Sequence, residues 1–432
     1  MKFNKHVLPN GLRVMTIPMP SFESATVLVM VQAGSRYETR KNSGIAHFFE
    51  HMAFKGTDRF PTAMDIASLI DGIGGEFNAF TGKEYTGYYI KSQTTHVPLM
   101  LDVLSDMLGH SKLDSKEIDK ERGVILEEMN MYEDTPMRNI GDVYERLLYG
   151  DTPLGWDTIG HKDVILSIKR EDFQEYMGSL YSADNMTVVV AGGVSDKEAL
   201  SQVKKYFGNM KRFKTKKPLP AKENQKTPQL HIKTKKTEQI HIALGVRTTD
   251  VNSKDRMPLS LLAAILGGGM SSRLFNEVRE KRGLAYYVRS HSDHYTDVGS
   301  FVSTAGIDPK RVLDAVDVMM DQYRLVAGGH MHIADSELRK AKEFSKGHLV
   351  LELEDSRSVA VYYAHQELLE DKTDNPDEVI DQIEAVTSEE IEAVGKKYFT
   401  NKGLNFALIG NFDPSSSSGQ GSRQKLEKLL KL

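Results

Sequence analysis

Two stretches of this chain carry the same pattern of residues at a constant separation of 218 positions. The first begins at Ile168 and the second at Val386. Each reads as a capped helix, a turn and an apolar run, which predicts buried strands over Met186–Ala191 and Leu404–Ile409. The period is far too long for a solenoid. We therefore expect an α+β fold that arose by internal duplication, with two homologous domains that each combine a sheet with helices.

A polar, basic stretch that contains proline separates the two copies at residues 212–228 and has the composition of a linker. We expect an N-terminal domain over residues 1–211 and a homologous C-terminal domain over residues 229–432. The lysines of the linker are interpreted as solvated and not as contacts to nucleic acid. Near the C-terminus, a spacer rich in serine and glycine, from Ser415, precedes a short basic helix to which the sequence assigns no role.

The run H-F-F-E-H, from His47 to His51, has the residue types and spacing of a metal site. Residues four apart share a helix face, so His47 and His51 can direct both rings at one ion. Glu50 lies at the edge of that face, near enough to act on a metal-activated water. Two neutral nitrogen ligands, an open position and a nearby base are what a hydrolytic zinc site needs. The order H-x-x-E-H is that of the inverzincins.

The alternative for these histidines is an ordinary place in the hydrophobic core. Their neighbours are indeed apolar, in a helix that we expect to end at Gly56. Two histidines and a glutamate on one apolar helix are costly to bury unless a metal ion offsets that cost. We therefore interpret His47 and His51 as metal ligands.

A second helix, predicted from about Asp114 to Asp134, offers a third ligand. Glu121 and Glu128 are seven residues apart in it and fall on nearly the same stripe. An apolar run precedes Glu128, which places these carboxylates close to buried surface. Glu117 and Glu133 are interpreted as part of a solvated helix face.

These motifs resemble those of the pitrilysin/insulinase family of zinc metallopeptidases, and H-M-A-F-K-G-T is especially similar to the branch that contains the mitochondrial processing peptidase β-subunit and its bacterial relatives. The resemblance implies that Glu128 is the third ligand of one zinc ion, beside His47 and His51. It also implies that Glu121 is a supporting carboxylate and that Glu50 is the base that activates water. Glu127 is a tempting alternative ligand, but it points about 100° away from the Glu121 stripe.

The segment from Gly74 to Ile90 resembles the edge strand to which substrates of this family add as an extra strand. Backbone hydrogen bonds from such an edge bind many extended peptides with little selectivity. The expected substrate contacts are Asn78, Ala79 and Phe80. The glycines from Gly72 to Gly75 are a weak signal for a phosphate loop, because no Gly-Lys-Ser/Thr follows them.

In the second half of the chain, Arg279 and Tyr286 match the arginine–tyrosine pair with which the family holds substrate and the developing oxyanion. The repeat segment from Met257 has no histidine or glutamate where the metal helix would be, so we expect a metal site in the first copy only. Longer family members present the pair from a fourth domain to the zinc of the first. The resemblance therefore implies a homodimer. The segment Pro153–Gly160 also resembles the family and is interpreted as structural.

The amino-acid composition narrows the classes of function that remain possible. A net charge of −4 spread along the chain argues against a nucleic-acid surface, and zero cysteines exclude disulfides and thiolate ligands. The sequence shows no apolar signal core, no arginine-rich presequence and no stretch near the ~18 apolar residues of a membrane span. We expect a cytoplasmic endopeptidase that hydrolyses unfolded peptides or presequences. The alternative is a catalytically silent structural or partner subunit of the same family. We favour the enzyme because the ligands, Glu50, Arg279 and Tyr286 are all present.

Overall fold

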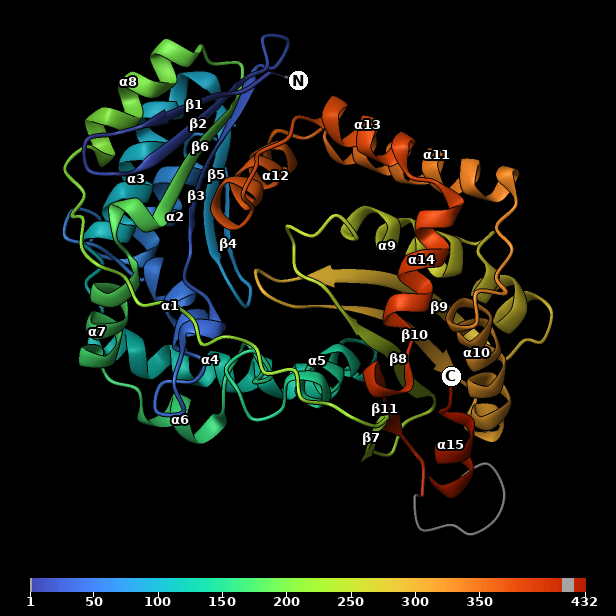
Figure 1. Cartoon of the computed structure of the whole chain (residues 1–432). Coiled ribbons are helices and arrows are strands. Elements are labelled where there is room, and N and C mark those ends of the chain that lie inside the picture. Colours follow the sequence, from blue (N-terminus) through green and yellow to red (C-terminus); the bar gives the residue numbers. More distant parts are fainter. Residues whose placement is uncertain (1, 414–422) are drawn as a thin grey trace. The chain divides into compact units, whose positions relative to one another are not determined.

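The computed structural model describes residues 2–413 and 423–432, which fold into two compact units (Figure 1). The first unit comprises the described residues of Met1–Asn130, Trp156–Leu219 and Leu349–Asp377. The second comprises those of Met131–Gly155, Pro220–His348 and Glu378–Leu432. Each unit combines one sheet with helices, so the predicted α+β fold is confirmed.

The sheet of the first unit has six strands in the order β1-β2-β6-β3-β5-β4. Its strands are β1 (Asn4–Val7), β2 (Arg13–Pro18), β3 (Ser24–Val31), β4 (Glu76–Thr81), β5 (Thr86–Gln93) and β6 (Met186–Gly192). The β2–β6 pair is parallel and every other pair in this sheet is antiparallel. Within the described residues β4 pairs only with β5, so β4 is an edge strand. The segment from Gly74 to Ile90, predicted as one edge strand, is instead a hairpin whose second strand, β5, lies between β3 and β4.

The sheet of the second unit repeats this topology with five strands, in the order β7-β11-β8-β10-β9. Its strands are β7 (Gln229–Thr234), β8 (Ile240–Thr248), β9 (Ala285–His294), β10 (Gly299–Ile307) and β11 (Leu404–Gly410). Its one parallel pair is β7–β11, which occupies the same place in the order as β2–β6. The two strands predicted from the repeat, β6 and β11, are therefore equivalent central strands, which supports the duplication.

The helices of the first unit are α1 (Ile45–Ala53), α2 (Ala63–Asp71), α3 (Val97–Gly109), α4 (Ser115–Glu133, whose last three residues belong to the second unit), α6 (Lys162–Ser167), α7 (Arg170–Leu180), α8 (Asp196–Phe207) and α12 (Ser356–Leu369). The helices of the second unit are α5 (Pro136–Tyr149), α9 (Arg256–Ala263), α10 (Val312–Ala327), α11 (Asp335–Glu352, which ends in the first unit), α13 (Pro376–Ala385, which begins in the first unit), α14 (Ser388–Tyr398) and α15 (Arg423–Leu429). The predicted helix from Asp114 to Asp134 is thus α4.

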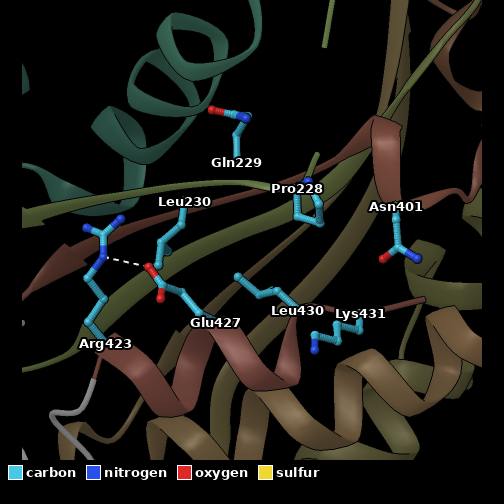
Figure 2. Close-up of a pocket in the computed structure, with 8 residues that line it drawn as sticks. All are labelled: Pro228, Gln229, Leu230, Asn401, Arg423, Glu427, Leu430 and Lys431. Carbon is cyan, nitrogen blue, oxygen red and sulfur yellow. Dashed lines mark hydrogen bonds and ion pairs between the residues drawn. The ribbon is translucent and has the colours of Figure 1, made fainter. Parts of the chain in front are cut away.

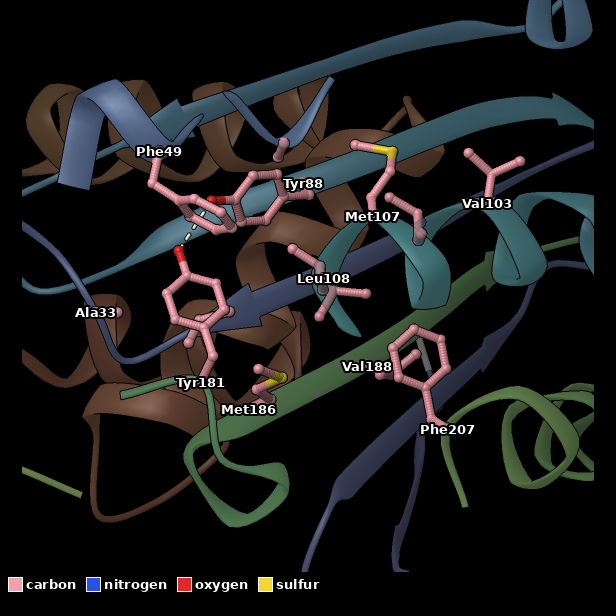
Figure 3. Packing of buried hydrophobic residues seen from close by; sticks show 14 of the residues in the cluster. Ala33, Phe49, Tyr88, Val103, Met107, Leu108, Tyr181, Met186, Val188 and Phe207 are labelled. Carbon is pink, nitrogen blue, oxygen red and sulfur yellow. Dashed lines mark hydrogen bonds between the residues drawn. The ribbon is translucent and has the colours of Figure 1, made fainter. Parts of the chain in front are cut away.

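The main core of the first unit lies on one face of its sheet, under α1, α3, α7 and α8. Phe49 of α1 packs edge-on against Tyr181, with ring centroids 5.0 Å apart. Figure 3 shows Phe49 beside Tyr88 and Tyr181, whose hydroxyl groups lie 2.9 Å apart in a buried hydrogen bond. Phe48, Phe49 and Met52 are fully buried. The apolar face of α1 is therefore fixed against this core.

The opposite face of each sheet is covered by a helix that the predicted ranges place in the other copy of the repeat (Figure 1). In the first unit, α12 packs on β3 and β6 through Val359, Ala360, Tyr363 and Ala364. In the second unit, α5 packs on β8 and β11 through Ile140, Val143 and Tyr144. Each compact unit therefore contains a helix that the predicted ranges 1–211 and 229–432 assign to the other copy. As borders between the duplicated copies, those ranges stay a prediction.

The C-terminal helix predicted after the serine-rich spacer is α15, while the spacer itself lies outside the described residues. The Arg324 side chain donates hydrogen bonds to the carbonyls of Leu429 and Lys431, which holds α15 in the second unit. A pocket of about 490 Å³ lies beside α15. Figure 2 shows residues that line it, among them the Arg423–Glu427 ion pair. Among the helices that the structure describes, none is long and apolar enough to cross a bilayer.

Candidate metal centre

The helix that carries the H-F-F-E-H run is fixed at its start by a close backbone approach. Gly44 precedes α1 with φ of 95°, and a Cβ atom there would lie 2.6 Å from the carbonyl oxygen of Ile159. Gly160 also has a positive φ, and its Cβ would meet the Cα of Gly44 at 2.4 Å. Only glycine fits such a left-handed, crowded position without strain. The Pro153–Gly160 segment thus supports the metal helix, in agreement with its structural interpretation.

A buried carboxyl group satisfies the first backbone donors of the same helix. The Oε2 atom of Glu38 accepts from the N–H of Gly44 at 2.7 Å, and its Oε1 atom accepts from Ala46 at 2.9 Å. Glu38 is 4% exposed, and burial raises the pKa of its carboxyl to about 8, although the two backbone hydrogen bonds and the nearby Lys83 oppose this shift. Glu38 therefore anchors the start of α1, as a capping side chain does.

The end of α1 differs from the prediction. The helix stops at Ala53, and Phe54 already has a non-helical ψ of 0°. Gly56, the predicted helix end, lies in the turn beyond with φ of 122°. The prediction placed the end too late because glycine was read as the residue directly after the helix, whereas the chain turns through two further residues before reaching it.

The three predicted ligands converge on one point. The Oε2 atom of Glu128 lies 3.6 Å from Nε2 of His47 and 3.5 Å from Nε2 of His51. One candidate ligand atom from each residue lies within 4.8 Å of the others. Zinc bonds of 2.0–2.2 Å in a tetrahedral site hold ligand atoms about 3.3 Å apart, so these three residues fit a zinc ion.

Glu121 contacts the His51 ring at Nδ1, the nitrogen that does not face Glu128. Its Oε1 atom lies 2.8 Å from Nδ1 of His51, and its Oε2 atom accepts from the Lys55 ammonium at 2.6 Å. Burial acts to raise the pKa of Glu121, but the hydrogen bonds from His51 and Lys55 outweigh it and the net pKa is lowered. A carboxylate there accepts the Nδ1 proton, which leaves Nε2 of His51 as the free ligand atom.

Glu128 also stays ionised. Its polar contact with the His47 ring is the largest cause of a lowered pKa and outweighs the effect of burial. Within the part of the chain that the structure describes, the buried Nδ1 atom of His47 has no hydrogen-bond partner, unlike that of His51. Among the described residues, His51 therefore has a carboxylate partner at Nδ1, whereas His47 has none at that atom.

The other glutamates of α4 lie away from the cluster. Glu127 is exposed and belongs to no metal group among the described residues. Glu117 and Glu133 form surface ion pairs with Lys120 and Lys233, as expected for a solvated helix face.

Glu50 is oriented by the edge strand. Its Oε2 atom accepts from the Thr81 hydroxyl at 2.5 Å. The predicted substrate contacts lie on the same strand: Asn78 is exposed, Ala79 packs toward the core under α1, and the ring of Phe80 lies edge-on to Tyr85. Their contact with a substrate stays a prediction.

Arg279 and Tyr286 form a pair in the second unit. The guanidinium carbon of Arg279, in the π-helix Phe275–Glu280, lies 5.9 Å from the ring centre of Tyr286 at the start of β9. Tyr286 is 71% exposed, so its hydroxyl group is available to a ligand. The catalytic role of the pair stays a prediction. The α9 helix, which follows β8 as α1 follows β3, contains neither histidine nor glutamate.

Sequence reasoning missed three residues that support the cluster: Glu38, Lys55 and Thr81. Two of them left a usable signal. Lys55 follows His51 by four residues, which is one helical turn. Thr81 alternates with Phe77 and Ala79 and therefore shares their strand face. For Glu38, nothing local in the sequence indicated that its carboxylate reaches the start of α1.

Two family models match the chain. The family model described as insulinase (peptidase family M16) matches residues 13–161, and the model described as peptidase M16 inactive domain matches residues 167–345. The whole metal cluster lies in the first range. A Bacillus subtilis (strain 168) protein named as an uncharacterized zinc protease is 37% identical over 400 residues, covering 92% of this chain and 95% of that protein.

Two further relatives span nearly the whole chain. The mitochondrial-processing peptidase subunit beta of Lentinula edodes is 31% identical over 430 residues, covering 96% of this chain and 91% of that protein. The crystal structure of a protease from Helicobacter pylori superposes with a TM-score of 0.89 at 26% identity, covering 95% of this chain and 99% of that chain. The family models and these relatives together show that the chain belongs to the insulinase family of peptidases, family M16, as its motifs predicted.

Proposed function

We propose that this protein is a zinc-dependent endopeptidase whose one zinc ion is held by His47, His51 and Glu128. The observation that carries the proposal is their convergence on one point, with Glu50 on α1, the helix that also carries both histidines. The lowered pKa of Glu128 and the Glu121 hydrogen bond to His51 prepare the site for a cation. The name of the Bacillus subtilis relative, a zinc protease, supports the same conclusion.

In the proposed reaction, the zinc ion and the protein side chains have separate roles. Bound zinc supplies Lewis acidity, which acidifies a water molecule and polarises a carbonyl. Glu50 is the general base: it takes a proton from the attacking water and passes it to the leaving amine. Arg279 and Tyr286 supply a cation and a hydroxyl donor for the negative charge that develops on the carbonyl oxygen.

The proposed substrates are unfolded peptides or presequences in extended conformation. The β4 strand is a sheet edge, and an extended backbone can pair with such an edge. Asn78, Ala79 and Phe80 are the residues of β4 proposed to meet the substrate. Since a folded protein rarely offers a free extended segment, stable compact proteins should be poor substrates.

We further propose a cytoplasmic homodimer. The proposal rests on the resemblance to longer family members, in which the arginine–tyrosine pair and the zinc site lie in different halves. Arg279 and Tyr286 would then serve the metal site of a partner subunit. A closed twofold pair is also the commonest soluble oligomer.

The alternative is a catalytically silent subunit of the same family. Silent members lose metal ligands or the base, whereas His47, His51, Glu128 and Glu50 are all present here. The discriminating experiment measures zinc content and cleavage of an internally quenched, unstructured peptide on one preparation. An endopeptidase contains zinc, cleaves the peptide, loses activity to a chelator and regains it with added zinc. A silent subunit fails to cleave at any zinc concentration.

A further inference from the structure

The hydrogen bond between Glu50 and Thr81 links the proposed base to the strand proposed to receive the substrate. The Thr81 hydroxyl lies 2.5 Å from Oε2 of Glu50. The hydroxyl group donates this hydrogen bond and the carboxylate oxygen accepts it. We propose that Thr81 is a positioning residue. It orients the Glu50 carboxylate for proton transfer and fixes the position of that carboxylate relative to the edge strand β4. This inference rests on the proposed function.

Glu50 has few other restraints on its carboxylate. Among the described residues, Thr81 is the one side chain that hydrogen bonds to it. The last torsion of a glutamate is soft, so packing of the helix alone does not fix the direction of the two oxygens. The Thr81 hydroxyl engages Oε2, which leaves Oε1 for the exchange of protons with water. A general base whose carboxylate is held in one direction spends a smaller fraction of its time in unproductive orientations.

Thr81 is itself held firmly. It pairs with Thr86 of β5, and the next residue, Gly82, donates its backbone N–H to Tyr85 at 2.8 Å to close the turn. Threonine is β-branched and stiff about its first side-chain torsion. The hydroxyl is therefore presented from a fixed backbone, which is what an orienting donor requires.

The same strand is joined to the metal helix at a second place. Phe77 shares the strand face of Thr81, and its ring centre lies 5.5 Å from that of Phe54, directly after α1. Contacts at Phe77 and at Thr81 fix β4 along most of its length relative to α1. A peptide that adds to the free edge of β4 would thus be registered by the strand that also orients the base.

The test compares Thr81→Val, which keeps the shape but removes the hydroxyl, with Thr81→Ser, which keeps the hydroxyl. Thr86→Val is the matched control, because Thr86 lies opposite Thr81 and its hydroxyl bonds to the Ala33 carbonyl instead. Zinc content, thermal unfolding, kcat and KM are measured for each full-length variant with a quenched peptide.

Loss of a hydrogen bond to a charged group should lower the kcat of Thr81→Val about 10- to 100-fold. Its KM and zinc content should stay at the wild-type level, and Thr81→Ser should recover most of the kcat. Thr86→Val should lower thermal stability but leave kcat unchanged. If the wild type is active and Thr81→Val has an unchanged kcat, the proposed role of Thr81 is wrong, while the proposed function stands. Equal losses in the valine and serine variants overturn it too. A zinc-loaded wild type without peptidase activity overturns the proposed function together with this inference.

Discussion

The Nδ1 atom of His51 lies 2.8 Å from the Oε1 atom of Glu121, and the other oxygen of Glu121 binds the ammonium group of Lys55. A metal-binding histidine commonly donates its second nitrogen to such a carboxylate, which fixes the tautomer and the direction of the ring. In the proposed zinc site, Glu121 would therefore act on the metal ion through His51, and Lys55 would act through Glu121.

Replacing Glu121 tests this relationship. Glu121→Gln removes the charge that pairs with Lys55 and weakens the acceptor for His51, so zinc affinity should fall about 10- to 100-fold. The affinity is measured by competition with a chelator of known strength. Glu117→Gln, a surface position on the same helix, should bind zinc as the wild type does. Equal affinities for the two variants would show that Glu121 has no part in holding the ligand.

Glu38 links pH to the stability of the first unit. Burial raises the pKa of its carboxyl to about 8, while an unfolded glutamate titrates near about 4.3. The folded unit therefore binds this proton more tightly. The resulting stability is complete below the unfolded pKa and is lost as the pH rises through the folded pKa.

The wild type and Glu38→Gln should differ in the slope of the free energy of unfolding against pH. From pH 5 to pH 8, the free energy of unfolding should fall more steeply for the wild type than for Glu38→Gln, which cannot titrate. Trp156, the one tryptophan of the chain, lies buried in the first unit, so its fluorescence reports on that unit. Parallel curves for the two proteins would mean that Glu38 is ionised throughout this range.

The place of α12 in the first unit can be tested through Tyr363, which is fully buried against the sheet of that unit. Tyr363→Ala should lower the stability of that unit by about 3–5 kcal/mol, as aromatic truncations in a core do. Denaturant unfolding followed by Trp156 fluorescence measures the change. Leu351→Ala, at a position 63% exposed, is the control and should cost little. An unchanged Trp156 transition in Tyr363→Ala would contradict the assignment of α12 to the first unit.

Subunit complementation tests the homodimer. His51→Ala chains lack the metal site and Tyr286→Phe chains lack the donor hydroxyl, so each protein alone should be nearly inactive. If Arg279 and Tyr286 act on a partner subunit, a mixed dimer holds one complete site. Mixing should then restore up to about half of the wild-type activity per mixed dimer, because one of its two sites is complete. Exchange of subunits, shown by a labelled chain, without any recovery of activity contradicts the proposal.

Much of the site was predictable because its chemistry is encoded by local spacing. His47 and His51 share a helix face wherever that helix lies, and Glu121 and Glu128 share a stripe of α4 for the same reason. The equivalent strands β6 and β11 were predictable from an apolar run that occurs twice.

What the sequence could not supply depends on tertiary packing. The central strands β6 and β11 are mostly apolar on both faces, which indicates burial on two sides but not which helix covers each side. The packing of α12 on the first sheet and of α5 on the second therefore leaves no local signature. The contacts of Thr81 with Glu50 and of Glu38 with Gly44 join residues 31 and 6 positions apart, and arise only once the sheet and α1 are packed.

The most direct test of the account measures zinc content and peptide turnover together in the wild type and three variants. The wild type should hold one zinc per chain and cleave the peptide. Glu50→Gln should keep the zinc but lose about 10²- to 10⁴-fold in kcat, since an amide cannot take up the proton. Glu128→Gln should lose the zinc, while Glu127→Gln should keep both zinc and turnover. Full activity in Glu50→Gln, or loss of zinc from Glu127→Gln instead of Glu128→Gln, would contradict the proposed site.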